Sequence, residues 1–208
     1  MVTPISATLA RHAIVLASAS LTRRAMLERA GLAVEVDRPR IDEDEIKRSM
    51  DAAGFDAANT AEALAEHKAR SVSRRHAGML VVGADQILEC DGSRLDKPAD
   101  LDAAGEQLRA LAGRRHDLVS VACVVLDGER LWHTVGRARL WVRPLTEEFI
   151  ADYLGAVGEA ALGGPGGYQV EGLGAHLFER IEGDHFTILG LPLLPLLDFL
   201  RGRGVVAA

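Results

Sequence analysis

The run Met79–Gly83 restricts the fold of this chain more than any other feature of its sequence. It is continuously apolar and ends at Ala84–Asp85, a pattern typical of a strand that is buried on both faces of a sheet. A second strand is expected at residues 13–17, directly before Ser18–Ala19–Ser20. Strands of this kind occur in sheets that helices cover, so helical segments are expected between the strands.

Several segments of the chain have sequence patterns typical of helices. A helix is expected from Thr22 to Ala30, with apolar residues on one face and Gly31 at its end. A second helix is expected to begin near Asn59, which can cap it with Glu62 as capping-box partner. Further helices are expected at residues 101–112 after a cap at Asp100, from Thr146 to Leu154, and from about Pro192.

The region between residues 118 and 142 has a β pattern. Asp127–Gly128 predicts a hairpin turn within it, Asp91–Gly92 predicts another turn, and a further hairpin is expected around Glu182–Gly183–Asp184. Strands interspersed with helices, together with this hairpin block, predict an α/β fold with a mixed β-sheet flanked by helices. The length of 208 residues suits a single domain over residues 1–208, with two small lobes around one cleft as the alternative.

Composition and charge argue against several classes of function. The chain has 24 basic and 30 acidic residues and a net charge of −6, which does not suit binding along a nucleic acid polymer. Met1–His12 lacks the apolar run of a signal peptide, and Ile188–Leu200 falls short of the roughly 20 residues that span a bilayer. Cys90 and Cys123 have no zinc-site spacing and are expected to be buried free thiols. A cytoplasmic protein without a membrane partner is expected.

Ser18, Ser20 and Arg23 are candidates for binding phosphate. They lie between a predicted buried strand and a helix N-terminus, where free backbone N–H groups and the helix dipole attract anions. Two hydroxyls and a guanidinium would complete such a site, because arginine matches phosphate oxygens bidentately. The pattern taken alone is also consistent with Ser20 as a simple helix cap and Arg23 in solvent.

Three charged features further along the chain have two interpretations each. The run Asp42–Glu43–Asp44–Glu45 could hold a divalent cation beside a triphosphate, or begin a solvated helix. Lys68 shares a predicted helix face with apolar residues, so it either reaches a partner or extends to the surface along its methylene groups. Lys97 is either a point charge for a leaving group or an ordinary loop lysine.

Asp85 is the strongest single candidate for catalysis. An apolar strand that ends in a carboxylate places it at the carboxyl end of the sheet, where the ligand sites of α/β folds gather. There it can bind a metal or accept a proton from water, and capping a turn is the alternative. His116 and His185 lack the spacing of metal ligands and are interpreted as structural.

In combination, these residues resemble the Maf family of nucleotide pyrophosphatases over nearly the whole chain. The resemblance rests on Leu16–Ala17–Ser18–Ala19–Ser20 with Arg23 and Leu27, Asp42–Glu43, Leu64–Ala65 with Lys68–Ala69, Gly83–Ala84–Asp85, Lys97–Pro98, Leu111 to Gly113 with His116, Tyr168, Glu171–Gly172, Gly183–Asp184 and Gly190–Leu191–Pro192. The resemblance implies a mixed-sheet α/β fold with a deep nucleotide-binding cleft, related in shape to inosine triphosphate pyrophosphatases. A homodimer is a further expectation from the family.

The resemblance also implies hydrolysis of a nucleoside triphosphate to the monophosphate and pyrophosphate, aided by Mg²⁺ or Mn²⁺. By carry-over, Asp85 accepts a proton from water, and Glu43 and Asp85 place the metal. The residues expected to bind the triphosphate are Ser18, Ser20, Arg23, Lys68 and Lys97. Attack at the α-phosphorus needs a base near water and cations at the leaving pyrophosphate, so these roles suit the chemistry.

Three positions bear on which base is preferred. Gln86 and Glu171 stand where the branch acting on dTTP and UTP typically has Thr and Gln, so the chain looks like the branch that prefers 7-methyl-GTP. A glutamate can accept hydrogen bonds from the N1–H and 2-amino groups of guanine. Thr22 stands where this branch often has a tryptophan, and the segment Glu159–Gly167 lacks the usual lysine.

Other functions are open at this point. The second hypothesis is a non-catalytic nucleotide-binding regulator of septum formation, linked to arrest of cell division, that senses triphosphates without hydrolysing them. The presence of Asp85, Lys68 and Lys97 favours the enzyme, which would prevent the incorporation of modified nucleotides. A plain phosphatase, which would release orthophosphate, is the third.

Overall fold

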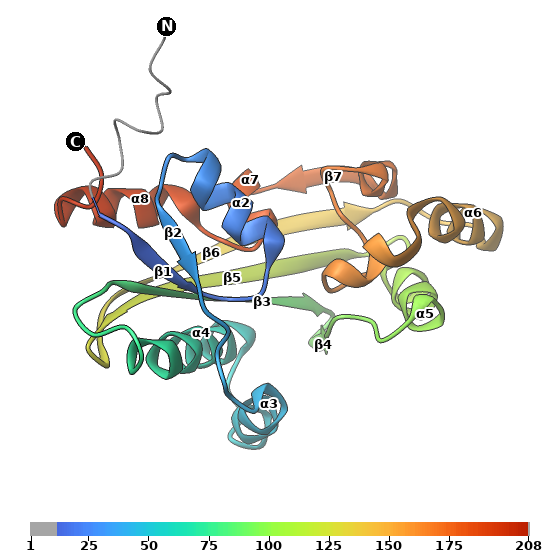
Figure 1. Cartoon of the computed structure of the whole chain (residues 1–208). Coiled ribbons are helices and arrows are strands. Elements are labelled where there is room, and N and C mark those ends of the chain that lie inside the picture. Colours follow the sequence, from blue (N-terminus) through green and yellow to red (C-terminus); the bar gives the residue numbers. More distant parts are fainter. Residues whose placement is uncertain (1–11, 208) are drawn as a thin grey trace, which may run out of the picture. The chain divides into compact units, whose positions relative to one another are not determined.

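The structure is a computed structural model that describes residues 12–207, and within them it contains a seven-stranded mixed sheet with flanking helices (Figure 1). The strand order is β2-β1-β3-β5-β6-β7, and β4 pairs with β3. The strands are β1 (Ile14–Ala17), β2 (Val34–Val36), β3 (Val81–Cys90), β4 (Ser93–Leu95), β5 (Arg115–Leu126), β6 (Glu129–Val142) and β7 (Phe178–Glu182). The predicted α/β class with a mixed sheet is confirmed.

Most of the helices lie between these strands in the chain, and two follow the last strand. They are α2 (Leu21–Arg29), α3 (Glu43–Ala52), α4 (Ala57–Ser73), α5 (Leu101–Leu111), α6 (Glu147–Val157), α7 (His185–Ile188) and α8 (Leu193–Gly202), with 3₁₀ helices η1 (Gly158–Gly163) and η2 (Leu173–Leu177). The expected helices near 22–30, 101–112, 146–154 and 192 are all present, each with ends within a few residues of the prediction.

Side-chain caps fix where most of these helices begin. Ser20, Asp100 and Thr146 each accept a hydrogen bond from a backbone N–H in the first turn of the helix that follows, as predicted. The predicted cap at Asn59 is wrong. Asp56 caps α4 instead, and its carboxylate accepts the Asn59 N–H at 2.8 Å. A carboxylate also interacts favourably with the positive end of the helix dipole.

Two of the three expected turns are present. Asp127–Gly128 joins β5 to β6, and Asp91–Gly92 joins β3 to β4. The hairpin expected around Glu182–Gly183–Asp184 is wrong, because the chain leaves β7 there and enters α7. β7 finds its antiparallel partner in β6 instead, with Leu140 opposite Ile181.

The chain divides into two compact units. The first consists, among the described residues, of 12–86, 120–136 and 185–207, and the second of Ile87–Val119 and Arg137–Asp184. In the first unit, β1 pairs in parallel with both β2 and β3. One face of these strands packs against α2 and α8, and α4 covers the other face (Figure 1). The core on the α2 and α8 side contains Ile14, Leu16, Met26, Leu27, Val82, Ala84, Leu196 and Leu200.

Two further expectations concern membranes and thiols. Within residues 12–207, every helix is too short or too polar to cross a bilayer. The expectation for Met1–His12 falls almost entirely outside the described residues. Cys90 and Cys123 are buried free thiols, as predicted.

His116 is a fully buried residue of the second unit. Its Nε2 lies 2.6 Å from the hydroxyl oxygen of Tyr168. Its Nδ1 is buried and has no hydrogen-bond partner among the described residues. The ring of Phe178 packs against both side chains. Burial lowers the pKa of His116 to about 4, so the imidazole is neutral at pH 7.

We expect His116 to make the chain less stable as the pH falls from about 6.5 towards about 4. The pKa of this histidine is about 6.5 when unfolded and about 4 when folded. The unfolded state therefore binds more protons in this window, and the free energy of unfolding decreases by up to about 3 kcal/mol as the pH drops. Urea unfolding at several pH values between 4 and 7 measures this dependence.

Two variants separate His116 from the other titrating groups. His116→Gln cannot titrate, so its free energy of unfolding is expected to depend less on pH in this window. His176→Gln removes an exposed histidine of the same unit and is expected to leave the pH dependence unchanged. An equal pH dependence in wild type and His116→Gln would contradict the prediction.

Candidate active site

Lys68 lies at the centre of a group of charged side chains in the first unit. Its ammonium nitrogen lies 2.6 Å from Oδ1 of Asp85 and 2.7 Å from Oε2 of Glu43. Lys68 and Asp85 are each only 7% exposed, whereas Glu43 is half-buried. The structure therefore supports the interpretation in which the ammonium group of Lys68 is buried and reaches a partner. Charges buried in this way are retained only when they are paired.

Asp85 does not end its strand, contrary to the prediction. β3 continues to Cys90, because its later residues pair with β4, with Leu88 opposite Leu95. The neighbouring strand β1 does end here, and its last residue, Ala17, lies opposite Gly83. Asp85 is thus in the middle of β3 but beyond the last residue that β1 pairs. The carboxyl end that marks this site belongs to β1.

Gly83 allows α4 to approach β3 closely enough for this ion pair. A Cβ atom at this position would lie 2.1 Å from the Ala65 carbonyl oxygen and 2.9 Å from the Ala69 Cβ, both on α4. Alternate residues of a strand share a face, so Gly83 and Asp85 both face α4. A glycine within an apolar strand run is a signal of such an approach.

Ser18 and Ser20 form a chain of short-range hydrogen bonds after β1. The Ser18 hydroxyl oxygen accepts the Ser20 N–H at 3.1 Å, and the Ser20 hydroxyl oxygen accepts the Arg23 N–H at 3.3 Å. Ser20 is therefore a helix cap. Because each hydroxyl oxygen accepts a backbone hydrogen, its own O–H hydrogen can point away and donate to an anion.

Arg23 is bound to the protein backbone. Its Nε donates to the Gly190 carbonyl at 2.8 Å, and its Nη1 donates to the Ala84 carbonyl at 2.9 Å. Burial lowers the pKa of Arg23, while the negative charges of Asp85 and Glu43 oppose that shift. Interpretation as a solvent-exposed arginine is therefore wrong, and the guanidinium lies within the electric field of the two carboxylates.

Gly190 makes room for this arginine. Its φ of +94° is strained for other residues, and a Cβ here would lie 3.3 Å from Nη2 of Arg23. The sequence motif Gly190–Leu191–Pro192 belongs to the family resemblance, but only the structure connects it with Arg23. The two residues are 167 positions apart in the chain.

Gln86 points to the opposite side of β3 from Asp85. Its amide nitrogen lies 2.9 Å from the Ser120 hydroxyl, 3.1 Å from the Thr187 carbonyl and 3.0 Å from the Ile188 carbonyl. These three acceptors occupy the amide hydrogens and fix the orientation of the side chain. Its Oε1, which would lie 3.6 Å from a Cβ on Gly190, remains as an acceptor on the side of Arg23.

The acidic run begins α3. Asp42 caps the helix and accepts the Glu45 N–H at 2.9 Å. Glu43, Asp44 and Glu45 occupy the first turn, as expected for a solvated helix start. Glu43 also reaches Lys68, so the run has a second role. Among the described residues, no group of three or more His, Cys, Asp or Glu side chains could hold a metal by itself.

The other predicted residues lie in different surroundings. Thr22 is half-buried in the first turn of α2. Lys97 and Glu171 are exposed residues of the second unit, and their roles in a common site remain predictions. Sequence reasoning missed Ser120 and Thr187, which hold Gln86. No local pattern marks them, because their contacts join residues 34 and 101 positions apart.

The first unit thus defines a class: an α/β protein with cationic side chains, carboxylates and serine hydroxyls gathered at the end of a parallel strand. A family described as Maf, Maf-like protein, matches residues 13–203, and the chain belongs to this family.

Relatives cover nearly the whole chain. A nucleoside triphosphate pyrophosphatase from Paramagnetospirillum magneticum is 51% identical over 91% of this chain and 98% of its own length. A 7-methyl-GTP pyrophosphatase from Rhizobium meliloti is 48% identical over 94% of this chain and 98% of its own length. A solved nucleoside-triphosphatase, dITP/XTP pyrophosphatase, from Mycobacterium abscessus is a distant match, with 22% identity over 63% of this chain and 73% of the other and a TM-score of 0.38.

We expect Gly83→Ala to destabilise the first unit, because the added Cβ would force α4 away from β3. Overpacking of this kind typically lowers the free energy of unfolding by about 1–3 kcal/mol. Gly155→Ala is the matched control, since a Cβ on Gly155 meets nothing within 4 Å, and alanine favours a helix over glycine by roughly 0.5–1 kcal/mol. Urea unfolding compares the variants with wild type, and equal stability of Gly83→Ala and wild type would contradict the close approach.

Proposed function

We propose that this chain hydrolyses a nucleoside triphosphate to the nucleoside monophosphate and pyrophosphate. The observation that carries the proposal is the Lys68 ammonium between Asp85 and Glu43. The same reaction is supported by relatives that are about 50% identical to this chain and are described as nucleoside triphosphate pyrophosphatases.

Asp85 is the residue that would accept the proton from the attacking water. Lys68 binds its Oδ1, so Oδ2 is the oxygen left to face water. The bond to Lys68 also fixes the orientation of the carboxylate, because Lys68 and Asp85 are both buried. A positioned base of this kind typically contributes a factor of about 10²–10⁴ to a reaction rate.

Ser18, Ser20, Arg23 and Lys68 would bind the triphosphate. The serine O–H groups can donate to phosphate oxygens, and the two cations counter the charge that develops on the leaving pyrophosphate. Lys97 would add a further positive charge, as the resemblance implies. Together these groups bind the ground state and stabilise the transition state at the α-phosphorus.

Glu43 and Asp85 would hold a divalent cation. Mg²⁺ and Mn²⁺ accept one or two carboxylates and complete their coordination with water and phosphate oxygens. Two carboxylates that reach one ammonium group fit this requirement, with the substrate supplying the remaining ligands. When bound, such a cation would polarise the phosphate and neutralise its charge.

We expect Asp85→Asn to reduce pyrophosphate release at least about 100-fold while nucleotide binding is retained. Asparagine keeps the size of the side chain but cannot accept the proton. Purified protein with Mn²⁺ and a triphosphate is assayed for pyrophosphate and for orthophosphate, and binding is measured by calorimetry. Asp152→Asn, which changes an exposed aspartate on α6, is the control and is expected to have wild-type activity.

The products distinguish this proposal from its alternatives. Tight nucleotide binding by wild type, without turnover across a broad panel of triphosphates, would favour a nucleotide-binding regulator of septum formation. Orthophosphate as the only phosphate product would indicate a plain phosphatase. Full activity of Asp85→Asn would exclude Asp85 as the base.

We further propose 7-methyl-GTP as the preferred substrate, so that the reaction removes a modified nucleotide before it is incorporated. Glu171 supplies carboxylate oxygens, and the fixed Gln86 amide leaves an acceptor rather than a donor. Guanine presents donors at N1–H and the 2-amino group, so acceptors suit it. The relative from Rhizobium meliloti described as a 7-methyl-GTP pyrophosphatase supports this choice.

Glu171→Gln is expected to lower kcat/KM for 7-methyl-GTP relative to dTTP by about 10-fold, the discrimination of one good hydrogen-bonded pair. Activity is compared on 7-methyl-GTP, dTTP, UTP and inosine triphosphate. Glu179→Gln, which changes an exposed glutamate of β7, is the control and is expected to keep the wild-type ratio. A wild-type enzyme that prefers dTTP would show that the assignment of Gln86 and Glu171 is wrong.

A further inference from the structure

Three side chains on one side of α4 contact the segment that leads to Glu43. Lys68 and Ser71 lie on α4, and Arg75 follows just after its end at Ser73. Spacings of three and four residues place them on one face. We call residues 37–42, which join β2 to α3, the strap. Arg75 contacts Asp37 and Arg38, Ser71 contacts Arg40, and Lys68 contacts Glu43 directly after the strap.

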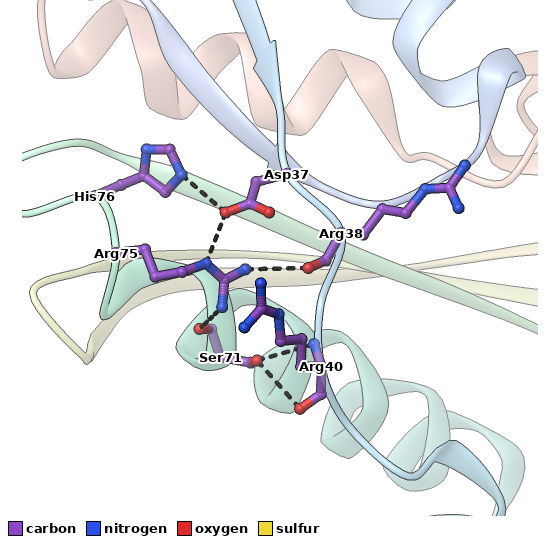
Figure 2. Close-up of polar contacts among 6 residues, drawn as sticks. All are labelled: Asp37, Arg38, Arg40, Ser71, Arg75 and His76. Carbon is purple, nitrogen blue, oxygen red and sulfur yellow. Dashed lines mark hydrogen bonds and ion pairs between the residues drawn. The ribbon is translucent and has the colours of Figure 1, made fainter.

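The Arg75 guanidinium uses all three of its nitrogens (Figure 2). Its Nε donates to Asp37 Oδ2 at 2.9 Å, its Nη2 to the Arg38 carbonyl at 3.0 Å, and its Nη1 to the Ser71 carbonyl at 3.1 Å. His76 Nε2 lies 3.0 Å from the same Asp37 oxygen. The hydrogen bond from Arg75 lowers the pKa of Asp37 to about 2, so this carboxylate is charged at neutral pH.

Ser71 binds the next part of the strap. Its hydroxyl oxygen accepts the Arg40 N–H at 3.1 Å and lies 3.4 Å from the Arg40 carbonyl, to which it donates (Figure 2). One hydroxyl thus binds both backbone groups of one strap residue. The next contact, one helical turn back along α4, is the ion pair of Lys68 with Glu43.

Glu43 is held less firmly than a core residue. α3 lies against α4, but no residue of α3 is buried, and α3 begins directly after the strap. The contacts of the strap therefore help to determine where the first turn of α3 lies. We propose that Asp37, Ser71 and Arg75 form a latch that binds the strap to α4 and thereby positions the Glu43 carboxylate on Lys68. The consequence for metal and substrate rests on the proposed pyrophosphatase function.

The geometry of Arg75 distinguishes the latch from an ordinary surface ion pair. An exposed ion pair that makes a single contact contributes little to stability, because two mobile side chains must be ordered for one weak interaction. Here one planar guanidinium joins a carboxylate and two backbone carbonyls, an arrangement that lysine cannot reproduce. The neighbouring Arg74 is exposed and has no hydrogen bond or ion pair from its side chain within residues 12–207. It is a matched control for charge.

The first experiment measures the Mn²⁺ dependence of pyrophosphate release by the full chain. Arg75→Gln is expected to raise the Mn²⁺ concentration for half-maximal activity about 10-fold and to change kcat at saturating Mn²⁺ less than about twofold. Arg74→Gln is expected to leave both values unchanged. Arg75→Lys keeps the charge without the three-point contact and is expected to behave like Arg75→Gln.

A second background tests whether Arg75 acts through Glu43. In Glu43→Gln, the carboxylate that the latch positions is absent, so adding Arg75→Gln is expected to cause no further rise in the Mn²⁺ requirement. Equal effects of Arg75→Gln in both backgrounds would overturn the proposal. A lower kcat and a lower urea midpoint with an unchanged Mn²⁺ requirement would also overturn it, because they indicate a purely structural role.

Amide hydrogen exchange in the nucleotide-free chain tests the latch without turnover. Arg75→Gln is expected to speed exchange at the Arg40 amide about 10-fold, while the amides in the middle of α4 and those of β3 keep their wild-type rates. Unchanged exchange at Arg40 would overturn the latch whatever the activity shows. If wild type releases no pyrophosphate, the proposed function fails, and exchange still decides whether the latch exists.

Discussion

The ammonium group of Lys68 holds together two carboxylates that would otherwise repel each other. Asp85 comes from a central strand and Glu43 from the start of a helix without a buried residue, and both reach the same nitrogen. Removing one partner of a buried ion pair typically costs about 3–5 kcal/mol, because the other charge stays buried. The close approach at Gly83 is therefore required by the chemistry of Lys68 as well as by packing.

A triphosphate would need more positive charge than Lys68 and Arg23 supply. Lys68 and Arg23 are balanced by Asp85 and Glu43, so the four side chains together carry no net charge. A strongly anionic substrate would gain little from such a group by long-range attraction. It would bind favourably only with additional positive charge, which is the part proposed for a divalent cation and for Lys97.

Local features of the fold could be predicted from the sequence, and long-range contacts could not. The caps at Ser20, Asp100 and Thr146 were predictable because a cap and the N–H that it accepts lie a few residues apart. The prediction that Asn59 caps α4 was wrong because Asp56, three residues earlier, caps the same helix. The residues of the site were found through motifs, but the partners of Lys68, Arg23 and Gln86 depend on which segments pack together, and no local pattern encodes that.

The two carboxylates of the site differ in how firmly they are held. Asp85 lies inside β3, which pairs with β1 before this residue, with β4 after it and with β5, so its position follows from the sheet itself. Glu43 follows a strap that is bound to α4 by polar contacts at partly exposed residues, which open more readily than a core does. This difference suits the proposed roles. A base must keep its geometry relative to the α-phosphorus, whereas a metal ligand can close onto its cation when the nucleotide arrives.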